Sequence, residues 1–86
     1  MAFYNDTFYT DAFTIKSIFG ESEANFDHDK QNYQWNLKTD KGIEFEIYDW
    51  KEGNITSFDK VFWHIGANSR KDSAEALKYV INKLLK

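Results

Sequence analysis

The stretch YQWNLKTDKGIEFEIY, residues 33–48, decides the fold because apolar and polar side chains alternate along both of its halves. A period of two is typical of a strand that buries one face. The segment Asp40-Lys41-Gly42 interrupts the alternation, and glycine in a short loop between two such runs favours a tight reversal of the chain. The sequence therefore predicts a β-hairpin with one apolar and one polar face.

Two further elements are expected after the hairpin. The run KVFWHIG, residues 60–66, predicts a strand with Val61, Trp63 and Ile65 on one face and Phe62 and His64 on the other. Residues 70–85 predict an amphipathic helix that begins at an N-cap formed by Ser69 or Asp72. The apolar stripe expected along this helix consists of Ala74, Leu77, Val80, Ile81, Leu84 and Leu85.

The region before the hairpin is less regular. Residues 1–11 follow no single period but carry four aromatic rings, so we expect an extended or irregular arm that docks on the body of the protein. Residues 12–19 fit either a strand or a short helix capped by Asp11 or Thr14 and followed by Gly20, and the helix is favoured. Residues 20–32 are acidic and poor in apolar side chains, which predicts a loop or an edge strand.

The chain of 86 residues is expected to form one α+β domain, spanning residues 1–86. Its centre is an antiparallel sheet of three or four strands in meander order, within residues 33–66, with the C-terminal helix packed on one face. The N-terminal arm is expected to cover an edge of this sheet. The side chains predicted to make the contact between sheet and helix are Trp35, Leu37, Phe45, Ile47, Leu77 and Ile81.

Composition excludes several classes of protein. Eleven basic against fourteen acidic side chains give a net charge of -3, which argues against general nucleic-acid binding. The lack of cysteine excludes disulfides, thiol catalysis and cysteine-based zinc sites. No apolar run approaches the length of a membrane span, and no signal peptide is evident at the start. Aromatic residues make up 19% of the chain, more than a domain of this size can bury, so some rings should be exposed.

The most conspicuous candidate site follows the second strand of the hairpin. Tyr48, Trp50 and Lys51 can form an aromatic and cationic platform, while Asp49 either points to the core side or caps turn amides. A second set would bind a planar, anionic ligand: Trp50 and Trp63 stack on the ring, and His64 or Asp49 selects among ring edges. In that set Arg70 and Lys71, at the start of the last helix, hold the anionic group.

Acidic residues suggest one more binding element. Glu21, Glu23, Asp27 and Asp29 form an acidic loop that can occupy a basic groove of a partner. Asp27-His28-Asp29 contains metal-ligand side chains, but a solvated loop is the better interpretation, and we expect neither a metal nor a cofactor. No nucleophile elbow, glycine-rich phosphate loop or HExxH motif is present in the sequence, so the protein is not expected to be an enzyme.

Several short motifs together resemble a family of small proteins from tailed bacteriophages. That family carries an IYDWK-like strand end followed by WHIGG or WHVGG before a C-terminal helix. The matching segments here are Phe19-Gly20-Glu21, Trp35-x-Leu37, Gly42, Ile47-Tyr48-Asp49-Trp50-Lys51 and Trp63-His64-Ile65-Gly66 with Ser69. The chain departs from the pattern at Glu46, where the family has Thr, and at Ala67, where it often has a second Gly. The resemblance implies a virus-encoded accessory protein acting in the host cytoplasm.

We therefore expect a non-enzymatic phage protein that binds and inhibits a host or defence protein, in the manner of anti-CRISPR and other counter-defence inhibitors. The alternative is a small-molecule binder that sequesters a nucleotide signal. A chain this short has little volume for a pocket, so the alternative would be served best by a pocket across a homodimer interface.

Overall fold

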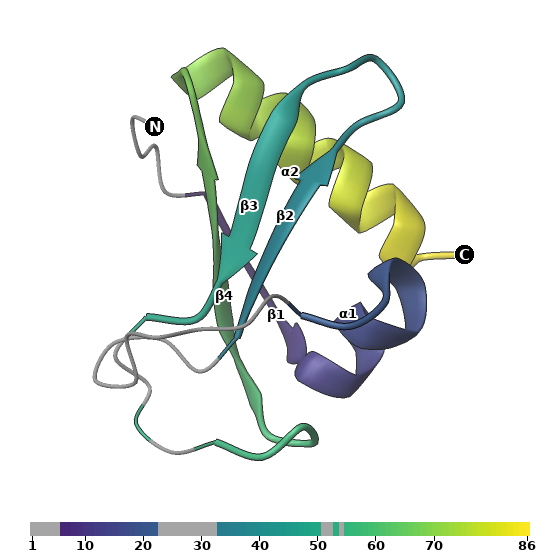
Figure 1. Ribbon diagram of the computed structural model, residues 1–86, viewed down its shortest axis with the longest axis vertical. Coiled ribbons are helices and arrows are strands. Elements are labelled where there is room, and N and C mark those ends of the chain that lie inside the picture. The colour runs from purple at the N-terminus through teal and green to yellow at the C-terminus, as the bar shows by residue number, and fades with distance from the viewer. Residues whose placement is uncertain (1–5, 23–32, 51–52, 54) are drawn as a thin grey trace.

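A computed structural model describes residues 6–22, 33–50, 53 and 55–86 of the chain. In order, the described elements are β1 (Asp6–Asp11), α1 (Ala12–Phe19), β2 (Gln34–Lys38), β3 (Glu44–Tyr48), β4 (Lys60–Ala67) and α2 (Arg70–Leu84). The four strands form one antiparallel sheet in the order β1-β4-β3-β2, and both helices pack on the same face of it (Figure 1). The predicted α+β fold is confirmed.

The hairpin and the strand after it follow the predicted meander. Gln34 pairs with Tyr48 and Lys38 with Glu44, so the alternation in the sequence becomes two faces of the sheet. Thr39 is buried in the connection, and its hydroxyl oxygen accepts hydrogen bonds from the backbone N–H groups of Lys41 and Ile43.

The predicted N-terminal arm contains a full strand of the sheet. β1 runs antiparallel to β4, from Asp6 opposite Ile65 to Asp11 opposite Lys60. Residues 1–5 of the predicted arm lie outside the described residues. Because β1 pairs with β4 and not with its neighbours in sequence, it places the beginning of the chain beside the end of the meander.

The short helix α1 has the limits that the sequence indicated. The Asp11 side chain caps its start by accepting a hydrogen bond of 2.7 Å from the N–H of Thr14. Gly20 ends it with φ of 91°, a left-handed conformation that glycine adopts without strain, and donates its N–H to the Lys16 carbonyl. The favoured helical interpretation of residues 12–19 is confirmed.

Of the two predicted N-caps of α2, the structure has Ser69 and not Asp72. The Ser69 hydroxyl oxygen accepts a hydrogen bond of 3.1 Å from the N–H of Asp72. The helix ends at Leu84, one residue before the predicted limit. The predicted apolar stripe is not centred on the buried face of α2. The fully buried side chains are Ser73, Ala76 and Val80. Of the predicted stripe, Ala74 is exposed and Leu85 is 79% exposed.

The shift of the stripe has a steric cause. Large rings on the sheet, Trp35, Phe45 and Trp63, already fill the space between the layers, so the helix approaches with small side chains. Of the six residues predicted to make the contact between sheet and helix, Trp35, Phe45 and Ile47 are fully buried. The other three, Leu37, Leu77 and Ile81, pack against the core at its rim.

Two indole groups hold α1 against the sheet. The Nε1–H of Trp35 donates to the carbonyl of Gly20, just after α1, at 2.8 Å. The Nε1–H of Trp63 donates to the carbonyl of Thr10, just before α1, also at 2.8 Å. The two indoles pack edge to face with centroids 5.6 Å apart. The core therefore fixes both ends of the short helix.

Candidate functional site

The sheet face opposite the helices is divided between aromatic and polar side chains. The register places Thr7 and Tyr9 of β1 beside His64 and Phe62 of β4 on this outer face. The β3 side chains on the same face are Glu44, Glu46 and Tyr48, and those of β2 are Gln34, Asn36 and Lys38. Among the described residues, no helix covers an apolar ring on this face.

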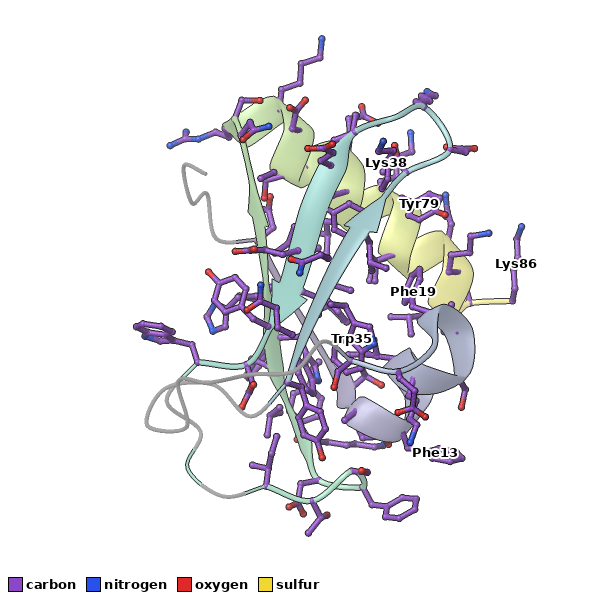
Figure 2. The ribbon with its side chains drawn as sticks, in the orientation of Figure 1. Phe13, Phe19, Trp35, Lys38, Tyr79 and Lys86 are labelled. Carbon is purple, nitrogen blue, oxygen red and sulfur yellow. The ribbon has the colours of Figure 1, made fainter. Side chains whose placement is uncertain are left out.

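Four exposed rings gather at one end of β1 and β4. Tyr9 and Phe62 pair across the strands with ring centroids 4.9 Å apart, and they are 58% and 56% exposed. Phe13 at the start of α1 and Phe58 in the turn before β4 pair at 5.4 Å, and they are 51% and 72% exposed. Figure 2 shows Phe13 pointing outward from α1. We call these four residues the aromatic surface.

The two ring pairs lie close in the chain. Tyr9 and Phe13 are four positions apart, as are Phe58 and Phe62, so in each case the Cα atoms lie within about 14 Å of each other. Taking about 200 Å² for one complete aromatic side chain, the four rings present roughly 470 Å² between them. That is somewhat more than half of the 800 Å² or so that each partner buries in a protein interface of standard size.

Hydrogen bonds fix the turn that presents Phe58. The N–H of Phe13 donates to the carbonyl of Ser57 at 2.9 Å, which ties α1 to this turn. Within the turn, the N–H of Thr56 donates to the Asp59 carboxylate at 2.8 Å. The N–H of Phe58 itself donates to the Thr56 hydroxyl oxygen at 3.2 Å. Rings held in this way lose little conformational freedom when a partner binds.

Two residues of the predicted platform, Tyr48 and Trp50, lie together with His64 of the predicted ligand set. Tyr48 and His64 stack across β3 and β4, with centroids 5.5 Å apart and an angle of 21° between the planes. Trp50 packs edge to face on Tyr48 at 6.4 Å and is 41% exposed. Lys51, the predicted cation of this platform, lies outside the described residues.

The predicted ligand set is not brought together in one chain. Trp63 is fully buried on the helix side of the sheet, whereas Trp50 follows Tyr48 and contacts it on the outer side. Arg70 and Lys71 begin α2 beyond the far end of β4. From His64 to Ala67 alone the strand rises about 10 Å, in the direction away from Trp50. Trp63 therefore belongs to the core, and we leave it out of the candidate surface.

Asp49 lies on the core side, which is one of the two alternatives that the sequence left open. It is fully buried, and its carboxylate accepts a hydrogen bond of 2.8 Å from the N–H of Tyr33. Since Gln34 and Tyr48 are the last paired residues, this bond closes the open end of the hairpin. Its role in the described structure is to hold β2 and β3 together.

The acidic loop is only partly described. Glu21 is exposed and forms an ion pair with the Lys16 ammonium at 3.2 Å. Glu23, Asp27 and Asp29 lie outside the described residues. The prediction that this loop binds a basic groove therefore stays a prediction.

Glu46, on the polar half of the outer face, has a partly buried carboxyl group. Its side chain accepts a hydrogen bond of 3.3 Å from the Gln34 amide, and its partial burial raises its pKa above the ordinary 4.5 through loss of hydration. Burial also raises the pKa of Tyr48, and the neighbouring charge of Glu46 adds to that effect. Ionised Glu46 is therefore less favourable in the folded protein than in the unfolded chain.

We expect Glu46→Gln to stabilise the protein at neutral pH. Because the pKa of Glu46 is raised on folding, the wild type loses stability as pH rises from about 4.5 through the raised value. Below that range the carboxyl is neutral in both states, so the advantage of the variant should disappear. Urea denaturation at about pH 4 and about pH 7 measures this difference.

The matched control is Glu44→Gln. Glu44 lies on the same strand and face but is exposed, and its carboxylate is 3.9 Å from the Lys38 ammonium. Removing it should leave stability unchanged or slightly lower at neutral pH. An equal gain from both substitutions would mean that reduced net charge, and not the burial of Glu46, is the cause.

Sequence reasoning missed the aromatic surface as a unit. One signal for it was present, since the alternation assigned Phe62 to the face opposite Trp63 and the aromatic content implied exposed rings. Tyr9 could not be added, because its position depends on the pairing of β1 with β4.

Comparison of the chain with protein-family models, curated proteins and solved structures gave no match. Within the residues that the structure describes, no helix combines the length and the apolar character needed to cross a membrane. The same residues contain no group of three or more histidine, aspartate or glutamate side chains arranged to hold a metal ion.

Proposed function

We propose that this protein is a non-enzymatic binding protein that inhibits a host or defence protein during phage infection, and that it contacts this partner through the aromatic surface. The observation that carries the proposal is the gathering of Tyr9, Phe13, Phe58 and Phe62 as two exposed ring pairs on a hydrogen-bonded scaffold. Phage origin and action in the host cytoplasm rest on the motif resemblance alone.

Exposed rings of this kind suit the centre of a protein interface. Tyrosine and other aromatic side chains are enriched at such centres, where a few of them supply most of the binding free energy. A surface ring costs little to order because it has few rotatable bonds. The combined exposed area of the four rings is comparable to the largest apolar patch on a typical monomer, about 300 to 600 Å², and such a patch is often functional.

The nucleotide-binding alternative has less support. It needs Trp50 and Trp63 on one side of the sheet together with Arg70 and Lys71, and these residues are separated as described above. Protein binding is therefore the proposal that we favour, and calorimetry with a panel of mono-, di- and cyclic nucleotides tests the alternative directly.

We expect the double substitution of Tyr9→Thr with Phe62→Thr to weaken partner binding by about 30-fold or more, because loss of a central aromatic contact typically costs 2 kcal/mol or more. Threonine retains the β propensity of both strand positions, so the fold should persist. The measurement is affinity capture from bacterial lysate with tagged wild type and variant. The captured protein is then titrated, and its own activity is assayed with each.

The matched control is Leu85→Ser. Leu85 is 79% exposed and apolar, but it lies at the C-terminal end of α2 and belongs to neither ring pair. It should leave capture unchanged. If the double variant captures and inhibits as well as the wild type does, the aromatic surface is not the binding site. If nucleotides bind tightly and no protein is captured, the alternative function replaces this proposal.

A further inference from the structure

The strand β1 forms one edge of the sheet. It pairs with β4 on one side only, and it has no strand partner on the other side among the described residues. The further contacts of its backbone include the indole of Trp63, which reaches the Thr10 carbonyl. An edge of this kind presents backbone N–H and C=O groups that an additional strand can pair with.

The chemistry of this edge is specific. The sequence of β1 is DTFYTD, with an acidic residue at each end and no basic one. Asp6 accepts a hydrogen bond of 2.7 Å from the hydroxyl of Ser73, and Asp11 caps α1, so both carboxylates are held in place. Between them, Tyr9 exposes its ring on the outer face and contacts the Phe62 ring at a tilt of 55°.

We propose that β1 accepts an extended segment of another protein as a fifth strand of the sheet, and that this segment is apolar in its centre and carries Lys or Arg near its ends. This inference rests on the proposed function, because it names the kind of partner segment that binds beside the aromatic surface. Backbone hydrogen bonds to β1 supply affinity, and the ring of Tyr9 contacts the apolar side chain that alternation places on the outer face. The two fixed carboxylates select the basic ends by charge complementarity.

A second copy of the chain fits this edge less well. In a fully overlapping antiparallel pair of two β1 strands, Asp6 of each copy lies opposite Asp11 of the other, so like charges meet at both ends. The opposite edge of the sheet is also a poorer acceptor. β2 has five residues and ends in Lys38, and lysine on an edge strand discourages pairing.

The test is selection from a displayed library of random short peptides on the immobilised full-length protein. We expect enrichment of peptides with β-branched or aromatic residues in the centre and Lys or Arg near both ends. A selected peptide should slow amide hydrogen exchange within residues 6–11 of β1 but not within residues 34–38 of β2. Failure to enrich any peptide, enrichment without basic ends, or protection confined to another part of the chain would overturn the proposal.

A charge-neutral variant provides the matched control. In the double substitution Asp6→Asn and Asp11→Asn, each side chain keeps an oxygen that can accept its hydrogen bond, and Asn is as good an N-cap as Asp. The variant should bind the selected basic peptide about 2- to 30-fold more weakly, as expected for the loss of two charge pairs near the surface. It should bind an analogue with neutral ends as well as the wild type does. Equal weakening of both peptides would count against charge selection.

Failure of this inference is distinguishable from failure of the proposed function. Peptide selection requires no host protein. If selected peptides bind β1 but no partner is captured from lysate, the edge proposal stands and the proposed function fails. If a partner is captured but the amides of residues 6–11 exchange as fast in that complex as in the free protein, the edge proposal is wrong and the binding function stands. Sedimentation of the protein alone adds one more outcome, since a dimer broken by substitutions in β1 would assign the edge to a second copy.

Discussion

Replacing Trp63 by Ala is expected to lower the free energy of unfolding by about 3 to 5 kcal/mol. Trp63 is fully buried, packs on Trp35 at 5.6 Å and on Tyr33 at 6.0 Å, and donates its indole N–H to the Thr10 carbonyl. The substitution removes all these contacts and leaves a cavity between sheet and helices. A domain of this size typically has a total stability of about 4 to 13 kcal/mol, so the loss removes between about a quarter and all of it.

Urea denaturation followed by circular dichroism measures this loss, with Trp63→Phe as the matched control. Phenylalanine keeps an aromatic ring in the core but cannot donate to Thr10, so it should cost less than alanine and still destabilise the β1–α1 junction. A loss below about 1 kcal/mol for Trp63→Ala would contradict the central place of this residue in the core.

The second large effect is expected at Asp49. Replacing it by Ala removes the acceptor of the Tyr33 N–H from a fully buried position, and hydrogen bonds to charged groups contribute about 1.5 to 3 kcal/mol each. We expect a loss of stability in that range. It should be accompanied by faster amide exchange at Tyr33, because this bond closes the open end of the β2–β3 hairpin.

The control for this prediction is Asp49→Asn, which keeps an oxygen at the same place and should lose less stability. Chemical denaturation of both variants, with amide exchange measured by NMR, separates the two effects. A loss in Asp49→Ala without faster exchange at Tyr33 would show that other contacts of Asp49 carry its contribution. If Asp49→Ala is as stable as the wild type, Asp49 does not stabilise the fold.

The local signals in this sequence were reliable where both partners of an interaction lie close in the chain. Alternation across residues 33–48 predicted the hairpin, and it gave the inward direction of Asp49 as one of two alternatives, because strand geometry sends alternate side chains to opposite faces. Asp11 and Gly20 marked the limits of α1, and Ser69 was one of two predicted caps of α2. Caps act within a few residues and need no knowledge of the fold.

The predicted stripe of α2 shows where a local pattern becomes ambiguous. Leu77, Ile81 and Leu84 are apolar and correctly spaced, yet Ser73, Ala76 and Val80 form the buried line. Helical periodicity identifies a broad face but not its centre, since the centre depends on how much space the opposing layer leaves. Here the indoles of Trp35 and Trp63 leave room only for small side chains.

By itself, then, the sequence determined the fold class and the hairpin with its two faces, and it favoured the helix α1 over a strand. The tertiary structure alone decided that residues 6–11 form a strand beside β4, and with it the edge of the sheet. It also separated Trp63 from Trp50, and it paired Tyr9 with Phe62 and Phe13 with Phe58 at the surface. The physical reason is that pairing between strands more than fifty residues apart is selected by the packing of the whole core, for which no short stretch of sequence carries a signal.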